Sequence, residues 1–505
     1  MILCFACIDI TYPSIIIGMN DNHKDKSIWE TRPPEDLRRY GALEGDLRTD
    51  VLVIGGGMAG YLTAYRLAAT GRKVTLVEGY RLFSGTTAKS TAKITYHQGE
   101  VYPTLVKNYG SEVAAMYYAA QCDGMRGYYE LVKRHCIDCD WQMLDSYVYS
   151  RREEQTEKLL DAMLKAGIAC RSEKLEYGGS AVSAVKAENQ FSFDPLRFLR
   201  ALPVNFDIYE NTRVIAMDAE NRLAVTPNGN IKADTIVVAT RYPIIDSHGS
   251  YFFKLRPSMS YTIAVKGAQA DATYLDIREN GLSIRPYGGG VTIGGCDRRT
   301  GTKGNDAFAE LERSAAEFFP GKEIEARWSA QDGVTFDGLP YIGSYSPELR
   351  GVYVIAGFGK WGMANSMVAA NLITDLVEGR REDYAEIFSP SRKTKGAAGG
   401  YVRHAFRSAA YIVLGNLHYP LVTARKIRAG EGKVVNLNGK KRAVYKEADG
   451  RLFAIEAMCP HLHAELKWNP LACTWDCPCH GSRFDRYGNV LCAPAVRSCK
   501  GHKGK

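Results

Sequence analysis

TDVLVIGGGMAGYLTAYRLAATGRKVTLVEG, at residues 49–79, predicts a strand, a glycine turn, a helix and a second strand in succession. Val51–Ile54 is an unbroken apolar run, which is typical of a strand buried on both faces of a sheet. Ala59–Ala69 has helical periodicity and is followed by Gly71, and Lys73–Val77 predicts the second strand. This order indicates the first βαβ unit of a Rossmann-like α/β domain.

The glycines of the turn form the pattern G-x-G-x-x-G, and each has its own physical task. Gly55 permits a tight turn, Gly57 lets the backbone approach a pyrophosphate, and Gly60 lets the helix pack closely on the strand. Glu78, eighteen residues beyond Gly60, can accept hydrogen bonds from an adenosine ribose. The unit therefore predicts a dinucleotide site. The acid at position 78 disfavours the 2′-phosphate of NADP, but the motif does not separate FAD from NAD.

Two later segments continue this pattern. GNIKADTIVVATRYP (229–243) predicts a strand over Thr235–Ala239, and the segment 337–379, which contains DGLPYIG and GFGKWGM, predicts a loop, a strand, a glycine-rich turn and a helix. Together with the opening unit they resemble the glycine oxidase/D-amino-acid oxidase (DAO) family of FAD-dependent oxidoreductases, from about Asp50 to Arg392. The resemblance implies FAD and an α/β Rossmann-like FAD-binding domain with an interleaved mixed-sheet substrate domain.

The resemblance also implies which residues hold FAD. The glycine turn and Glu78 would hold the ADP half, Val214 would lie near the adenine, and SGTTAKSTAKIT (84–95) would line the flavin. The helix that starts near Gly362 would point its positive end at the flavin and stabilise the anionic reduced ring. The expected FAD contacts are Gly55, Gly57, Met58, Ala59, Gly60, Glu78, Thr86, Thr87, Val214, Ala239, Thr240, Gly357, Gly362 and Met363.

One position departs from the family. In many relatives that oxidise amino acids, an Arg-Pro pair before the DG-P-IG motif supplies an arginine that clamps the substrate carboxylate, whereas this chain has Asp332-Gly333. Because an acid repels a carboxylate, we expect an amine or an amino-acid derivative as substrate, unless Arg256 or Arg285 replaces the missing arginine. The candidates for a catalytic role are Lys89, Lys93, His97 and Lys360, and the alternative is that they are ordinary structural residues.

A second motif lies near the other end of the chain, where CPHLHAELKWNPLACTWDCPCHGSRFD spans residues 459–485. Cys459-x-His461 and Cys477-x-x-His480 are fifteen residues apart, and each half offers one cysteine and one histidine. This arrangement suits a cluster in which one iron takes both thiolates and the other takes both imidazoles. Residues 428–496 resemble a Rieske [2Fe–2S] domain with these four ligands, and a zinc site is the alternative.

The rest of this window predicts the properties of the cluster. In respiratory Rieske proteins a disulfide joins the equivalent of Cys479 to a position that is Ala464 here, and a tyrosine that donates to a ligand sulfur is Phe484 here. Ser482 remains in place to donate to a cluster sulfide. Because fewer donors stabilise the reduced cluster less, we expect a potential below about 0 mV, toward the lower end of the Rieske range. The side chains expected not to be ligands are His463, Cys473 and Cys479.

Composition excludes several other classes of protein. The net charge of +9 comes from 65 basic and 56 acidic residues that are scattered along the chain, which does not indicate a nucleic-acid binder. Six of the thirteen cysteines follow residue 458, and the others do not form the disulfide pattern of a secreted protein. We therefore expect the protein to be located in the reducing cytoplasm. The pair Cys136-x-x-Cys139 is interpreted as structural, with a redox pair or half a zinc site as alternatives.

Neither apolar stretch predicts a membrane span. Residues 1–18 are interrupted by Asp9, and we expect them to be an extension that precedes a more natural start at Met19. Residues 405–422 contain Arg407 and His418 and predict a buried or docking helix. The predicted organisation is a lead-in over 1–48, a DAO-type domain over 49–392, a linker or docking helix over 393–429 and an all-β Rieske domain over 430–505.

The two ends together predict a function. FAD accepts two electrons from a small-molecule substrate whereas a [2Fe–2S] centre carries one, so the chain would pass electrons singly to an external acceptor, as a dehydrogenase rather than an oxidase. The glycine-rich run 395–400 would let the Rieske domain move between the flavin and that acceptor. A non-catalytic redox sensor or electron-transfer protein is the alternative. A Rieske oxygenase is disfavoured because no pair of histidines outside the window has the H-x3–4-H spacing of a mononuclear iron site.

Overall fold

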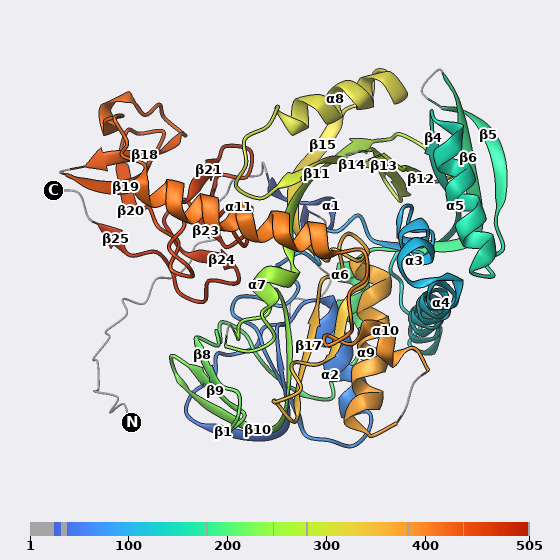
Figure 1. The fold of residues 1–505 in the computed structure, drawn as a ribbon, viewed down its shortest axis with the longest axis horizontal. Helices are drawn as coiled ribbons and strands as arrows, with labels where there is room; N and C mark the ends of the chain where they lie inside the picture. Colours follow the sequence, from blue (N-terminus) through green and yellow to red (C-terminus); the bar gives the residue numbers. More distant parts are fainter. Residues whose placement is uncertain are drawn as a thin grey trace.

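The computed structural model describes residues 25–31, 38–177, 180–245, 247–278, 281–380, 383–437 and 439–502. Residues 1–18, the predicted extension, lie outside the described residues. The predicted combination of an α/β domain, an interleaved mixed sheet and an all-β C-terminal domain is confirmed (Figure 1). No helix among the described residues is both long and apolar enough to span a bilayer.

The opening unit forms the centre of a parallel sheet. The strand β1 (Leu47–Ile54) pairs in parallel with β2 (Val74–Val77) and with β10 (Gly229–Arg241). The helix between β1 and β2 is α2 (Met58–Ala68), which packs against α9 (Gly362–Val377). The sheet is extended by β7 (Asp207–Tyr209), β17 (Val352–Ala356) and β16 (Tyr341–Ser344), while β9 (Leu223–Thr226) pairs with β10 and β8 (Ala216–Asp218) pairs with β9.

The second sheet is built from segments that alternate along the chain with those of the first, as expected. It is mixed, because β4 (Gln142–Ser150) and β12 (Ala272–Asp276) pair in parallel while the other pairs are antiparallel. The remaining strands are β3 (Lys93–Ile94), β5 (Arg171–Tyr177), β6 (Ser180–Ser192), β11 (Arg256–Lys266), β13 (Ser283–Tyr287), β14 (Gly290–Arg299) and β15 (Ile324–Val334). The longer helices around it are α3 (Val101–Tyr109), α4 (Ser111–Arg134), α5 (Glu153–Lys165) and α8 (Ala307–Phe318), and the shorter ones in this half are α1 (Ile28–Thr31), α6 (Pro195–Ala201), α7 (Tyr251–Lys254) and α10 (Ala385–Phe388).

The C-terminal domain consists of two antiparallel sheets of four strands each. One contains β18 (Gly432–Leu437), β19 (Lys440–Lys446), β20 (Leu452–Glu456) and β25 (Gly501–His502), and the other contains β21 (Lys467–Asn469), β22 (Thr474–Asp476), β23 (Arg483–Asp485) and β24 (Val490–Cys492). The two loops that carry the predicted metal ligands join β20 to β21 and β22 to β23.

A long helix, α11 (Ala398–Leu417), joins the two halves and crosses the front of the molecule (Figure 1). Its inner face is buried at His404, Ser408 and Gly415, whereas its outer face is exposed. The helix is therefore a docking helix with one open side rather than a buried one. Because the run 395–400 leads directly into it, and Gly400 packs against Phe336, these glycines do not form an open linker here.

Candidate functional site

The glycine turn closes β1 onto α2 with almost no space for side chains. Gly55 has a φ of +113°, and a Cβ on it would lie 2.6 Å from the carbonyl oxygen of Ala239. A Cβ on Gly60 would lie 1.9 Å from the carbonyl oxygen of Gly55. Gly57 has no side chain with which to cap α2, and although Thr87 Oγ1 accepts the N–H of Met58, the first turn contains no acidic residue. The positive end of α2 therefore meets no negative charge from its own first turn, which fits the pyrophosphate of FAD.

Glu78 follows β2 and holds the turn in place. Its carboxylate accepts the backbone N–H groups of Gly56 at 2.8 Å and of Tyr80 at 2.9 Å. Desolvation raises the pKa of Glu78, and these two N–H groups and the charge of Arg213 oppose that shift. Glu78 thus has a structural task, and its bond to a ribose stays a prediction.

The segment expected to line the flavin is fixed at two points. Thr87 Oγ1 accepts the backbone N–H of Met58, at the start of α2, at 2.9 Å. Thr86 Oγ1 accepts a hydrogen bond of 3.0 Å from Nη1 of Arg241, at the end of β10. The two threonines therefore connect this segment to both sides of the glycine turn.

The other expected FAD contacts lie along the same edge of the sheet, where ligands bind in open α/β folds. This edge is formed by the carboxyl ends of β1, β2, β10 and β17 together with the start of α9. The positions there are Ala239, Thr240, Gly357, Gly362 and Met363, with Val214 buried next to the sheet. Their contacts with FAD, and those of Ala59, stay predictions.

Lys93 is the catalytic candidate with the most unusual environment. Its Nζ donates to Ser283 Oγ at 2.6 Å and lies 5.8 Å from the centre of the Trp361 ring, directly before α9. Desolvation, followed by the charges of Arg285 and Lys360, lowers the pKa of Lys93 to about 8. A lysine in this range can exchange a proton near neutral pH, so it stays a candidate.

The other three candidates have structural partners. Lys89 forms an ion pair of 2.8 Å with Glu30, and Lys360 forms one with Asp297. The Nδ1 atom of His97 lies 3.1 Å from the Ser146 carbonyl oxygen, and burial lowers the pKa of His97 to about 3, so its ring is neutral.

Asp332 lies on β15 in register with Ser258 of β11. Desolvation raises the pKa of Asp332 to about 7, against the opposing charge of Arg241 and a hydrogen bond with Ser260. Arg285, one of the two proposed replacements for the missing arginine, is buried, donates to the Phe193 carbonyl oxygen at 2.8 Å and lies 4.9 Å from the Trp29 ring centre. These contacts give Arg285 a structural task, and its role as a carboxylate clamp stays a prediction, as does that of Arg256.

The four predicted metal ligands come together between the two loops of the C-terminal domain. Cys459, Cys477 and His480 are buried, and the rings of His461 and His480 lie 5.2 Å apart at 88°. A hydrogen bond between the two thiols raises the pKa of Cys459 and lowers that of Cys477. Thiols and imidazoles thus form two neighbouring pairs, as the mixed ligation of a Rieske cluster requires.

The ring of His480 supplies a test of this fit. Its Nδ1 is buried and has no hydrogen-bond partner among the described residues, and burial lowers the pKa of His480 to about 3. A buried, neutral imidazole nitrogen with an unused lone pair is suited to bind iron. The residues therefore fit a [2Fe–2S] cluster, and the assignment of these four ligands is our proposal.

The remaining residues of the window occupy other positions. The Ser482 hydroxyl bonds to Cys459 and accepts the Ala495 N–H at 3.0 Å. Ala464 and Phe484 belong to the apolar core of this domain. Cys473 and Cys479 are in no disulfide, and the Cys479 thiol donates to the Ser408 carbonyl oxygen at 3.3 Å, so the thiol that forms a bridge in respiratory relatives bonds to α11 here.

The loop that carries Cys477 and His480 packs directly against the flavin half. Arg299, at the end of β14, donates to the carbonyl oxygens of Pro478 at 2.8 Å and of Cys479 at 2.6 Å. A third nitrogen of Arg299 lies 3.1 Å from Nδ1 of His404, whose ring lies 6.1 Å from that of His480. Arg299 is 9% exposed, so these are enclosed, charge-assisted contacts.

Glycines make this approach possible on both sides of the boundary. A Cβ on Gly301, at a φ of +73°, would lie 2.8 Å from the Pro478 nitrogen. A Cβ on Gly481, at a φ of +83°, would lie 2.3 Å from Nε2 of Gln331 and 2.5 Å from Cβ of Pro257. The two backbones are therefore in direct contact.

A chain of hydrogen bonds crosses the boundary at this point. Gln331 Nε2 donates to the Gly481 carbonyl oxygen at 2.8 Å, and Gln331 Oε1 accepts from Arg241 at 3.1 Å. Arg241 in turn donates to Thr86 in the expected flavin segment. The contacts thus run without a break from the loop of His480 to that segment.

Nothing in the sequence indicates that Arg241, Arg299, Gln331 and His404 form this boundary. Arg299, Gln331 and His404 belong to no quoted motif, and although Arg241 lies in GNIKADTIVVATRYP, that stretch does not indicate its partners, because these positions depend on packing between segments far apart in the chain.

Comparison with known proteins now assigns both halves. The family described as DAO, FAD dependent oxidoreductase, matches residues 50–376, and the Rieske [2Fe-2S] domain matches residues 418–503. The chain belongs to the DAO family of FAD-dependent oxidoreductases. It also carries a Rieske domain, so its cofactors are FAD and a [2Fe–2S] cluster.

Individual relatives agree with this assignment. A Bacillus subtilis (strain 168) protein named as a Rieske 2Fe-2S iron-sulfur protein, YhfW, is 33% identical over 94% of this chain and 97% of its own length. Gamma-glutamylputrescine oxidoreductase of Escherichia coli (strain K12) is 22% identical over 68% of this chain and 87% of its own length. The crystal structure of glycine oxidase from Geobacillus kaustophilus has a TM-score of 0.57 at 21% identity, covering 69% of this chain and 99% of that chain, which shows a shared fold.

Replacing Gly60 tests the FAD site. We expect Gly60→Ala to abolish FAD retention, because its Cβ would lie 1.9 Å from the Gly55 carbonyl oxygen and force α2 away from β1. The measurement is the flavin-to-protein ratio after purification, with the cluster signal as a check on the other half. Gly41→Ala is the matched control, because nothing lies within 4 Å of a Cβ there. Full FAD retention in Gly60→Ala would contradict the site.

Serine substitutions test the cluster ligands. Cys459→Ser and Cys477→Ser should each remove the cluster, because the predicted thiolate ligand is lost. Cys473→Ser and Cys479→Ser should retain it. Iron and acid-labile sulfide content, together with the EPR spectrum of the reduced protein, distinguish the two groups. Loss of the cluster in Cys473→Ser but not in Cys459→Ser would refute the assignment.

Asp332 should make stability depend on pH. Its folded pKa of about 7 lies above the ordinary 3.8, so the stability that it contributes is present below about pH 4 and is lost as the pH rises through 7. Asp332→Asn removes this titration. We therefore expect the melting temperature of the native protein, relative to that of Asp332→Asn, to fall between about pH 4 and pH 7. A constant difference across this range would show that Asp332 does not titrate as expected.

Proposed function

We propose that this protein is a cytoplasmic FAD-dependent dehydrogenase that oxidises an amine or amino-acid derivative and passes the electrons one at a time through its Rieske cluster to an external acceptor. The observation that carries the proposal is the buried boundary at which the loop of Cys477 and His480 meets the flavin half. An oxidase that delivers its electrons to oxygen has no need of such a contact.

The cofactors supply the electron chemistry, since FAD takes up two electrons and the cluster carries one. The residues of the chain hold the two domains in position relative to each other. Arg299 holds the backbone of the cluster loop, and Gln331 connects that loop to Arg241 and Thr86. At Gly301 and Gly481 the two domains approach each other so closely that an added Cβ would overlap Pro478, or Gln331 and Pro257. A hydrogen-bonded boundary of this kind is suited to hold two redox centres of one chain in a defined arrangement.

Asp332 supports an amine or an amine derivative as the substrate. Where many amino-acid oxidising relatives carry a cation, this chain carries a carboxyl that ionises near neutral pH. An ionised carboxylate attracts an ammonium group and repels a carboxylate. The name of one relative, gamma-glutamylputrescine oxidoreductase, is that of an enzyme for an amine derivative.

In this proposal the chain consists of a lead-in (1–48), a DAO-type domain (49–392), a linker or docking helix (393–429) and a Rieske domain (430–505). We also expect the Rieske domain to move away from the flavin half, because the external acceptor must reach the cluster. The loop of Cys459 and His461 is exposed at Leu462 and His463, which offers one place for that contact.

Anaerobic mixing with a panel of amines and amino-acid derivatives tests the function. We expect at least one compound to bleach the flavin, and the EPR signal of the reduced cluster to follow. A redox sensor would show no flavin reduction with any compound. Flavin bleaching without reduction of the cluster would refute the proposed direction of electron flow.

Arg299→Met tests the boundary. We expect electron transfer from photoreduced flavin to the cluster, measured by laser flash photolysis, to slow by about tenfold or more, equal to about 1.4 kcal/mol of activation free energy. The reason is the loss of hydrogen bonds to Pro478 and Cys479. The control is Arg298→Met, because Arg298 donates to Tyr261 and Asn305 instead. An unchanged rate in Arg299→Met, with both cofactors present, would contradict this role.

A further inference from the structure

The outer face of α11 is an unusual surface. Its exposed apolar side chains include Val402 (70% exposed), Phe406 (76%), Leu414 (65%) and Leu417 (75%). Eight of the fifteen large hydrophobic side chains that are exposed in the described part of the chain fall in the short segment 402–422. Scattered exposed hydrophobics are ordinary, but a concentration of this kind marks an interaction site.

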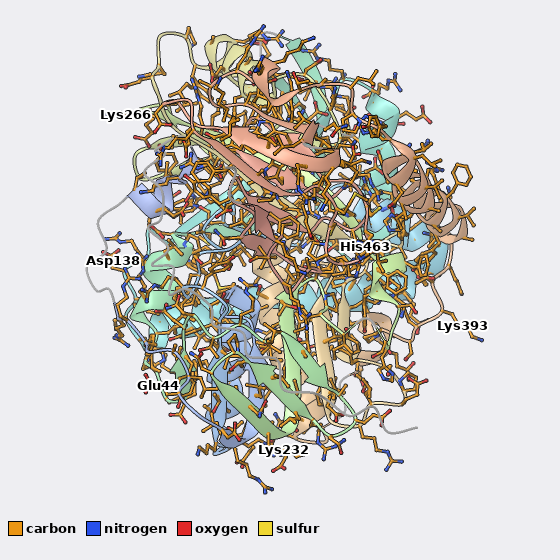
Figure 2. The ribbon with its side chains drawn as sticks, turned by 90° about the vertical axis from the view of Figure 1, so that its left-hand side faces the viewer. Glu44, Asp138, Lys232, Lys266, Lys393 and His463 are labelled. Carbon is orange, nitrogen blue, oxygen red and sulfur yellow. The ribbon has the colours of Figure 1, made fainter. Side chains whose placement is uncertain are left out.

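The helical period places four of the exposed apolar side chains of α11 in one row. At 100° per residue, Val402, Phe406, Val413 and Leu417 fall within an arc of about 60°. The opposite side of the helix, at His404, Ser408 and Gly415, is buried against the rest of the molecule. Beyond the end of the helix, Tyr419, Leu421 and Val422 are also exposed, at 63%, 90% and 36%. In Figure 2, α11 lies at the right-hand edge of the molecule with side chains that point outward.

All charged residues of the longer stretch 387–430, which contains α11, are basic. Between Glu386 and Glu431 the sequence contains no aspartate or glutamate. Arg403 and Arg407 lie along one edge of the apolar row at about 100° and 140° from Val402. The exposed basic side chains of the segment are Lys393, Lys395, Arg403, Arg407, Arg425, Lys426 and Arg428.

We propose that the outer face of α11 and the segment 419–422 bind the surface of an anionic lipid bilayer. Helices that lie in a membrane interface combine an exposed apolar row with lysine and arginine beside it. The apolar row lies on the outside of a helix rather than in a groove, which suits a flat apolar phase. A second copy of this chain fits less well, since facing copies would bring basic side chains together with no acid in the segment to pair with them.

If α11 binds the bilayer in this way, the loop that carries Cys459 and His461 lies close to the bilayer surface. The Asn416 side chain, on the last turn of α11, donates to the His463 carbonyl oxygen at 3.1 Å. Leu462, beside the predicted ligand His461, is 40% exposed. The exposed edge of the cluster loop therefore lies next to the row, and His463 is labelled on the same half of the molecule in Figure 2. The proposal itself rests on the surface and does not depend on the substrate or on the direction of electron flow.

Vesicle flotation with the full-length holoprotein tests the proposal. Native protein should float with vesicles of phosphatidylglycerol and phosphatidylcholine, should bind vesicles of phosphatidylcholine alone much less, and should be released in part by high salt. Phe406→Ser/Leu417→Ser should reduce the bound fraction by about tenfold or more. Arg403→Glu/Arg407→Glu should abolish the preference for anionic vesicles. The matched control is Leu164→Ser, an exposed leucine on α5 (54%), which should bind like the native protein.

Unchanged flavin and cluster spectra in every variant would show that the fold is intact, since the replaced side chains are exposed. Three outcomes would overturn the proposal: no binding of native protein to anionic vesicles, equal binding by Phe406→Ser/Leu417→Ser, or equal loss of binding in Leu164→Ser. A native dimer in light scattering that Phe406→Ser/Leu417→Ser converts to a monomer, without vesicle binding, would assign the face to a second copy instead.

Discussion

Direct backbone contact between the cluster loop and the flavin half is the constraint on which the arrangement of this protein depends. Gly301 and Gly481 face the opposite domain at positions where a Cβ would overlap Pro478, Gln331 or Pro257. Arg299 and Gln331 can reach the loop carbonyl oxygens only because the backbones come this close. The contact joins two domains of different architecture into one redox unit, and neither domain contains it alone.

The helix α11 has two different faces, and its inner face takes part in this contact. On the inner face, His404 lies between Arg299 and the Phe252 carbonyl oxygen, and the Ser408 carbonyl oxygen accepts the Cys479 thiol. On the outer face, apolar and basic side chains are open. The helix therefore fixes the position of the cluster on one side while it presents a surface on the other.

The sequence predicted the fold well because local rules decide it. The glycine turn at 55–60, the alternation of strands and helices and the spacing of Cys459, His461, Cys477 and His480 each depend on short segments. The boundary could not be predicted in this way. Arg299 and Gln331 have ordinary neighbours in the chain, and their partners lie 179 and 150 residues away, at Pro478 and Gly481. The exposed face of α11 could not be predicted for a related reason, since the same apolar sequence suits a buried helix as well as a docking helix until packing shows which side is covered.

The enclosure of the cluster loop has a consequence for how the protein is made. Cys459, Cys477 and His480 are almost fully buried, and the loop of the last two lies beneath Pro257, Arg299 and Gln331. On this side the flavin half covers the ligands, whereas the other loop, which carries Cys459 and His461, is exposed at Leu462 and His463. We therefore expect iron and sulfide to be inserted more readily before the two domains close on each other than afterwards.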